Sequence, residues 1–201
     1  MFSSHDSLLK INQKVSTMKR FSALLLTVAF AMMSFAIGAQ NFTLDPAKSA
    51  MTVAGTSTLH DWESNVEKIT SKGSLAEDGK LKSVELSVPV ESIKSGKSGM
   101  DKKTYEALKS DDHPNITFSS ITPVAIVDGK ASISGKLTVA GVSKDVTIPV
   151  EISKDGNTMT LKGSHLINMP GYSMKPPTAM MGTIKTGEDI TVTFQLVYNI
   201  Q

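Results

Sequence analysis

The sequence predicts an all-β domain built as a single antiparallel barrel of about eight strands. After residue 40, hydrophobic and polar side chains alternate with a period of two, which is typical of strands with one buried and one solvated face. Asp-Gly dipeptides at positions 78–79, 128–129 and 155–156 separate such segments and favour tight hairpins between antiparallel neighbours. A two-sheet sandwich is the alternative that the same pattern allows.

The first 39 residues have the features of an export signal. The basic pair Lys19-Arg20 precedes a predominantly apolar run over residues 21–37, and the small residues Gly38 and Ala39 follow. This order of charge, apolar stretch and small residues is typical of a cleaved signal peptide. We therefore expect residues 1–39 to be removed, with no stable transmembrane anchor left after cleavage. Residues 40–201 have a length that suits one domain with one hydrophobic core.

The composition of residues 40–201 excludes some classes of function. This part of the chain contains 17 lysines, 18 acidic residues and no arginine, so its formal net charge is −1. Nucleic-acid-binding proteins usually present a clustered basic face and depend on arginine, so we expect no nucleic-acid partner. The whole chain lacks cysteine, which excludes disulfides, a thiolate nucleophile and thiolate metal ligands.

The predicted strands differ in how clearly they alternate. The clearest alternation covers residues 83–90, 131–139, 146–152, 159–167 and 190–200. Weaker segments of the same type cover residues 50–59, 62–75 and 116–127. Joined mainly by short turns, these segments predict a meander that closes on itself and so removes exposed sheet edges.

A short helix is predicted within residues 95–113, where the strand pattern stops. Ser98 is the expected N-cap and Asp101 lies in the first turn, while Tyr105 and Leu108 are spaced to share one face. We expect the apolar side of this helix to lie against one mouth of the barrel.

Residues 168–188 form the second break and are rich in proline, glycine and methionine. They predict a long ordered loop that covers the mouth rather than a strand. Five methionines occur in the two breaks, at Met100, Met169, Met174, Met180 and Met181. Flexible methionine side chains suit a surface that adapts to a lipid chain, but they also fill gaps beneath loops, and both interpretations stay open.

The alternating faces leave open whether the barrel is hollow or filled. An eight-stranded barrel is either packed by its own side chains or just wide enough for one small ligand. The inward positions are mostly aliphatic, and Gly135 and Gly163 fall in the same register. We expect these glycines to leave room inside, which favours a cavity.

The polar residues at inward or turn positions do not form a recognisable catalytic or metal site. Trp62, the only tryptophan, either contacts a ligand head group at the mouth or seals one end of the core. His165 falls in an inward register and is either a hydrogen-bonded interior residue or a polar ligand contact. The remaining candidate ligands lack the spacing of a metal site: His60, His113, Asp61, Asp111 and Asp112.

Motifs of common enzymes are also missing. The chain has no G-x-S-x-G elbow, H-E-x-x-H helix or G-x-G-x-x-G fingerprint. We therefore predict that the protein is not an enzyme and has neither a cofactor nor a metal. A hydrolase or isomerase using His165 or His60 is kept as a third hypothesis.

Three stretches stand out as motifs: residues 112–120 (DHPNITFSS), residues 135–146 (GKLTVAGVSKDV) and the opening strand at residues 42–53 (FTLDPAKSAMTV). Together they resemble the YceI-like family of bacterial periplasmic polyisoprenoid-binding proteins. Residues 55–62 and 171–182 are similar to a Bacteroidetes-type branch of that family. The resemblance implies a lipocalin-like eight-stranded barrel in the periplasm, with a long isoprenoid or related lipid in its interior.

The predicted function is therefore that of a periplasmic binding or carrier protein for a long apolar ligand, such as a polyisoprenoid or isoprenoid quinone. The alternative is an envelope structural or interaction module with a packed core and no ligand. The sequence leaves a homodimer open. The predicted ligand contacts are Trp62, Val84, Leu86, Val88, Tyr105, Leu108, Phe118, Leu137, Val139, His165, Met174, Met180, Val192, Phe194 and Leu196.

Overall fold

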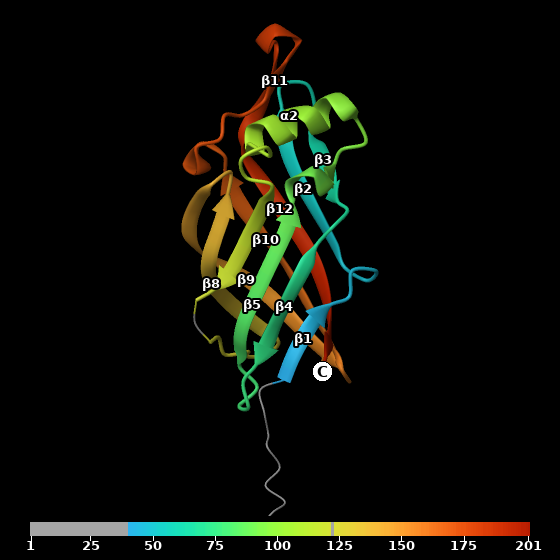
Figure 1. The fold of residues 1–201 in the computed structure, drawn as a ribbon, viewed down its shortest axis with the longest axis vertical. Helices are drawn as coiled ribbons and strands as arrows, with labels where there is room; N and C mark the ends of the chain where they lie inside the picture. The colour runs from blue at the N-terminus through green and yellow to red at the C-terminus, as the bar shows by residue number, and fades with distance from the viewer. Residues whose placement is uncertain (1–39, 122) are drawn as a thin grey trace, which may run out of the picture. The chain divides into compact units, whose positions relative to one another are not determined.

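Eight strands follow one another as antiparallel neighbours and close into a barrel (Figure 1). This computed structural model describes residues 40–121 and 123–201, so the predicted export segment lies outside the described residues. The ring runs β1-β4-β5-β7-β8-β9-β10-β12 and is closed by pairing between β12 and β1. The predicted all-β barrel is confirmed, and the sandwich alternative is wrong.

The elements have the following bounds. The strands are β1 (Gln40–Leu44), β2 (Ala50–Ser57), β3 (Trp62–Val66), β4 (Thr70–Leu75), β5 (Leu81–Pro89), β6 (Ile93–Lys94), β7 (Asn115–Ser120), β8 (Lys130–Val139), β9 (Val142–Asp155), β10 (Thr158–Asn168), β11 (Thr178–Ala179) and β12 (Ile184–Ile200). The helical segments are α2 (Ser98–Leu108) and the 3-10 turns η1 (Val90–Ser92), η2 (Pro170–Tyr172) and η3 (Met180–Gly182).

Three walls of the barrel are strands broken in two. β2, β3 and β6 continue the walls begun by β1, β4 and β5, at the end of the barrel where α2 lies (Figure 1). The predicted strand over residues 62–75 is therefore two strands, because the Glu67 N–H leaves the ladder and bonds to the Ser92 carbonyl at 2.8 Å. The predicted segment 116–127 is a strand only as far as Ser120.

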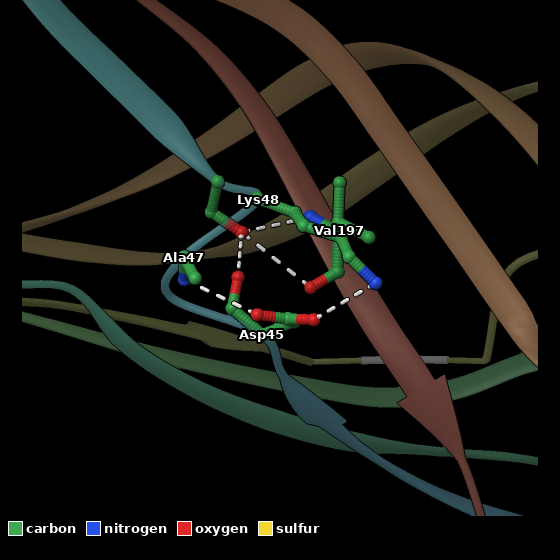
Figure 2. Close-up of polar contacts among 5 residues, drawn as sticks. Asp45, Ala47, Lys48 and Val197 are labelled. Atoms are coloured by element: carbon green, nitrogen blue, oxygen red, sulfur yellow. Dashed lines mark hydrogen bonds and ion pairs between the residues drawn. The ribbon is translucent and has the colours of Figure 1, made fainter.

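The break between β1 and β2 is held against β12 by a small polar cluster. The Asp45 N–H donates to the Val197 carbonyl at 2.8 Å, and Ser49 Oγ accepts from the Val197 N–H at 2.9 Å. The Asp45 carboxylate accepts from the Ala47 N–H at 3.1 Å and pairs with Lys48 at 3.3 Å (Figure 2). β1 and β2 therefore follow the same edge of β12 despite the interruption.

Two-residue turns link neighbouring antiparallel segments, and the first joins Val127 to Lys130 at the start of β8. Asp128 and Gly129 both have positive φ, of 49° and 70°, as a type I′ turn requires, which confirms the predicted turn. The turn between β9 and β10 is centred on Gly156-Asn157, one residue later than predicted, because Asp155 still pairs with Thr158. The Ala140-Gly141 turn, where alanine takes a φ of 48°, was not predicted from the sequence.

The helix is confirmed but its predicted N-cap is wrong. Lys97 holds the N-cap position, and Ser98 is the first helical residue. The Asp101 carboxylate instead reaches back to Ser95, accepting from its backbone N–H at 2.8 Å and from its hydroxyl at 2.6 Å. This contact resembles the return half of a capping box, so an acidic side chain fixes the entry into the helix.

The loop after β10 is shorter than predicted. β10 ends at Asn168, but β12 begins at Ile184, because Ile184 and Lys185 already pair with β11 and Thr186 pairs with Ser57 of β2. β11 and β12 thus form a hairpin that rises beside α2 at one end of the barrel (Figure 1).

Candidate ligand-binding cavity

The interior of the barrel is filled at one end and hollow at the other. At the end away from α2, four core side chains are at most 2 % exposed: Phe42, Leu75, Leu81 and Met159. Toward α2 the walls enclose a cavity of about 460 Å³. Its size falls within the range of small-molecule binding sites, and most of its surface is apolar.

Most of the predicted contact residues line this cavity. They are Trp62, Val84, Leu86, Val88, Leu108, Phe118, Leu137, Val139, His165, Met174, Val192, Phe194 and Leu196. Those on strands lie inside because they occupy alternate positions on inward faces, while Leu108 lies on α2 and Met174 follows η2. Their contact with a ligand stays a prediction.

Tyr105 is not among the residues that line the cavity, and its contact with a ligand stays a prediction. Its hydroxyl faces η1 and β6, where it lies 3.0 Å from the Glu91 carbonyl and 3.1 Å from the Ile93 carbonyl and accepts from Lys94 at 2.7 Å. The cavity face of α2 contains Met100, Thr104, Ala107 and Leu108, a spacing of three and four residues. Tyr105 lies on a different stripe of the helix and anchors α2 to the barrel wall.

Met180 is also absent from the cavity lining, and its contact with a ligand stays a prediction. It is 74 % exposed, and its neighbour Met181 is fully exposed. The other methionines of the two breaks, Met100, Met169 and Met174, do line the cavity. The five methionines therefore form two groups, one inside the barrel and one outside.

Gly135 and Gly163 do not provide the empty space that we expected. The ring of Phe118 lies over Gly135, at the place where a Cβ atom would be. The ring of Phe194 lies over Gly163 in the same way, 2.8 Å from the ideal Cβ position. The room that each glycine leaves is thus filled by an aromatic ring, and the cavity comes from the separation of the walls instead.

The mouth of the cavity is more polar than its interior. Lys97 and Lys103 of the α2 segment line it, together with His60 from the turn between β2 and β3. Lys103 pairs with Glu106 at 3.0 Å. Trp62 also lines the cavity, and its indole N–H donates to the Thr56 carbonyl at 3.1 Å.

The polar side chains that line the apolar interior include His165 and the buried Ser64 and Tyr198. Burial lowers the pKa of His165 below its ordinary value of 6.5, which favours the neutral imidazole. Tyr198 closes the cavity toward the filled end, with its hydroxyl 2.9 Å from Ser71 Oγ. Burial raises the pKa of Tyr198 to about 12, so its hydroxyl stays protonated. Both His165 and Tyr198 present neutral hydrogen-bonding atoms, and neither adds a charge to the cavity.

The remaining histidines have other surroundings. His60 Nδ1 lies 2.7 Å from the Asp61 carbonyl oxygen, and the His113 ring packs beneath Gly141 at the turn between β8 and β9. Among residues 40–121 and 123–201, no three His, Asp or Glu side chains are grouped to hold a metal ion. Within the same residues, no helix is both long and apolar enough to cross a membrane.

Several lining residues were not singled out from the sequence. Ile133, Val150, Leu161 and Ile167 lie on the inward faces of β8, β9 and β10, where the alternation that identified their neighbours also marked them. The lysines at the mouth carried no such signal, because their position depends on where α2 crosses the barrel.

Comparisons with known proteins agree with this architecture. The family model for the YceI-like domain matches residues 42–198. No curated protein sequence matches the chain.

Solved structures of similar fold come from several bacteria. BcnA of Burkholderia cenocepacia has a TM-score of 0.66 and 22% identity, over 77% of this chain and 98% of that one. A polyisoprenoid binding domain from Saccharophagus degradans has a TM-score of 0.63 and 14% identity, over 80% and 98%. The YCEI protein of Campylobacter jejuni has a TM-score of 0.58 and 18% identity, over 68% and 83%. At these identities the likeness shows a shared fold.

Proposed function

The chain belongs to the YceI-like domain family, and we propose that it binds one long apolar molecule of the isoprenoid or related lipid class inside its barrel. The observation that carries the proposal is the cavity of about 460 Å³ with an apolar lining. A barrel filled entirely by its own side chains, as in the structural-module alternative, would leave no such volume. The polyisoprenoid binding domain of similar fold adds support for this ligand class.

The physics of the cavity favours recognition by chain length. Each buried methylene group of a ligand contributes about 0.8 kcal/mol, so a long tail binds tightly without a polar contact. Lys97 and Lys103 at the mouth are placed to meet a polar or anionic head group, and His165 offers one neutral hydrogen-bonding site inside. In this proposal the protein carries its ligand and does not transform it.

We place this function in the periplasm. The order of basic pair, apolar run and small residues before residue 40 supports export. The intact mass of the protein recovered from a periplasmic extract tests this, with the expected mass being that of a chain beginning near Gln40. A recovered chain that still carries residues 1–39 would contradict it.

The binding proposal is tested by filling the cavity from one strand. Val192 points inward on β12, while its neighbour Thr193 points outward and is exposed. We expect Val192→Trp to weaken binding of a long-tailed isoprenoid quinone by at least about tenfold, because the indole occupies the volume of the tail. Thr193→Trp is the matched control and should bind as the wild type does.

Two measurements decide the outcome. Native mass spectrometry of the purified protein should show a retained lipid that Val192→Trp lacks. A titration of Trp62 fluorescence with quinones of increasing tail length should give increasing affinity. A wild-type protein that retains no lipid and responds to no quinone would overturn the proposal.

A further inference from the structure

Three large apolar side chains project into solvent beside the cavity mouth. They are Leu59 from the turn between β2 and β3, and Met180 and Met181 from η3, and we call them the mouth tip. They are 65 %, 74 % and 108 % exposed, respectively. The other exposed large apolar residues of the described chain lie elsewhere, with Ile121 and Val127 between β7 and β8 and Leu166 on β10.

The mouth tip is unusual in its backbone conformation as well as in the exposure of its side chains. Met180 and Met181 both have positive φ, of 49° and 54°, a region that residues other than glycine, asparagine and aspartate seldom adopt. Two consecutive methionines in this conformation carry a conformational cost, while their side chains make no compensating burial. Polar or glycine residues would form the same turn with less strain and less exposed apolar surface.

The mouth tip is fixed in place and adjoins the cavity. Thr58 donates its backbone N–H to the Lys185 carbonyl at 3.0 Å and accepts the Lys185 N–H on its hydroxyl at 3.2 Å. These bonds hold the turn that carries Leu59 against the β11–β12 hairpin that carries the methionines. Leu59 itself lines the cavity, as do Pro177 and Ile184 of the hairpin, so the exposed apolar surface runs into the apolar interior.

Lysines outnumber acidic residues on the segments that carry and adjoin the mouth tip. Residues 169–187 contain Lys175 and Lys185, both exposed, and no acidic residue, although residues 40–201 as a whole have a net charge of −1. Lys97 and Lys103 line the mouth from the other side, where Lys103 pairs with Glu106, and the turn that carries Leu59 contains one exposed acid, Asp61. Apolar side chains flanked by an excess of lysines match an anionic lipid surface, where the side chains enter the acyl boundary and the lysines meet the head groups.

We propose that the mouth tip docks this protein on the surface of an anionic phospholipid bilayer, with the cavity mouth facing the lipid. This docking goes beyond ligand binding, and it requires no ligand in the cavity. In that orientation an apolar molecule passes between bilayer and barrel without crossing open water.

Vesicle flotation tests the docking. The probe is the chain from residue 40 to 201 mixed with vesicles of phosphatidylglycerol and phosphatidylethanolamine, or of phosphatidylcholine alone. We expect flotation with the anionic vesicles, weakening with added salt, and little with the neutral ones. The double variant Met180→Asn and Met181→Asn should lower the partition coefficient by at least about tenfold, because asparagine tolerates the positive φ but is not apolar.

Val127→Asn is the matched control, since Val127 is 63 % exposed at the filled end of the barrel, and it should float like the wild type. The docking proposal is overturned if the wild type does not float, if the double variant floats equally well, or if the control loses as much. It is also overturned if sedimentation shows a dimer that the double variant abolishes, which would assign the tip to self-association. Lipid retained by the double variant would leave the proposed binding function intact.

Discussion

Glycines and aromatic side chains meet across neighbouring strands at four places in this barrel. The pairs are Gly55 with Trp62, Gly73 with Phe42, Gly135 with Phe118, and Gly163 with Phe194. In each pair the ring covers the space that a side chain at the glycine would occupy. The period-two pattern correctly assigned Gly135 and Gly163 to inward positions, but it could not show that a ring on the adjacent strand had taken their space.

Substitution of Gly135 therefore tests packing and not the presence of a ligand. We expect Gly135→Ala to lower the free energy of unfolding by about 1–3 kcal/mol, because a Cβ atom would displace the Phe118 ring. Gly99→Ala is the control: its Cβ would contact nothing in α2, and alanine should stabilise the helix by about 0.5–1 kcal/mol. Urea unfolding measures both changes, and a neutral Gly135→Ala would show that the ring is free to move.

His165 makes stability depend on pH in a direction that its surroundings fix. Burial lowers the pKa of the folded imidazole below 6.5, so the unfolded chain binds the proton more readily. Stability should therefore fall as the pH drops from 7 through 6.5 toward the lower pKa of the folded state. His165→Gln should show a smaller fall in the free energy of unfolding between pH 7 and pH 5 than the wild type.

The matched substitution for this comparison is His60→Gln, at the exposed histidine of the mouth. A wild-type protein and a His165→Gln variant with the same pH profile would contradict the assignment. An NMR titration of the His165 ring checks the direction of its pKa independently.

Among the elements, the long unbroken strands were predictable and the broken ones were not. The inward faces of β8, β10 and β12 alternate over ten or more residues, which gives a period that no helix shares. By contrast, the breaks at residues 45–49 and 67–69 depend on hydrogen bonds to distant residues such as Val197 and Ser92. The angle at which α2 crosses the barrel also depends on tertiary packing. The sequence therefore predicted one shared face for Tyr105 and Leu108, whereas in the structure Leu108 lines the cavity and Tyr105 contacts η1 and β6.

Asp101 is expected to stabilise α2 through its bonds to Ser95. Those two hydrogen bonds lower the pKa of the Asp101 carboxyl. Asp101 therefore adds to the free energy of unfolding at a pH above the ordinary pKa of a carboxyl group, and this stabilisation is lost as the pH falls through the lowered pKa of the folded state. Asp101→Ala should reduce the free energy of unfolding at pH 7 by about 0.5–2 kcal/mol, as loss of a helix cap does. Asp111→Ala, at an exposed site just after the helix, should change it by less than about 0.5 kcal/mol. Equal effects in urea unfolding would contradict this role.

At the scale of the whole molecule, the barrel combines the two interiors that the sequence left open. Large side chains such as Phe42 and Met159 fill one end, while valines, leucines and isoleucines at the α2 end are too short to meet across the ring. The alternation of each strand is the same in both halves, so the pattern predicts the ring but not where it is filled. The volume of the cavity depends on which side chains face one another across the ring, and that follows only from the register of the closed sheet.

Closure of the ring depends on the edge of β12 that faces β1 and β2. We expect this edge to be sensitive to substitution of Ser49. The Ser49 hydroxyl accepts from the N–H of Val197, a buried residue, and donates to the Asp45 carbonyl at 2.7 Å. Ser49→Ala would leave that N–H unpaired, and we expect it to lower the free energy of unfolding by about 1–3 kcal/mol. Ser134→Ala, which removes an exposed bond to Thr147 and leaves no backbone group unpaired, should cost less than about 0.5 kcal/mol.

Hydrogen exchange distinguishes a weakened seam from a general loss of stability. Relative to the wild type, Ser49→Ala should increase the exchange rate of the Val197 amide more than the rates of the amides of β8 and β9, which lie away from the edge between β12 and β1. If all amides exchange faster by the same factor, the ring opens only by global unfolding and Ser49 has no special part in closure. Faster exchange confined to the edge of β12 that faces β1 and β2 would mean that the barrel opens first along this edge.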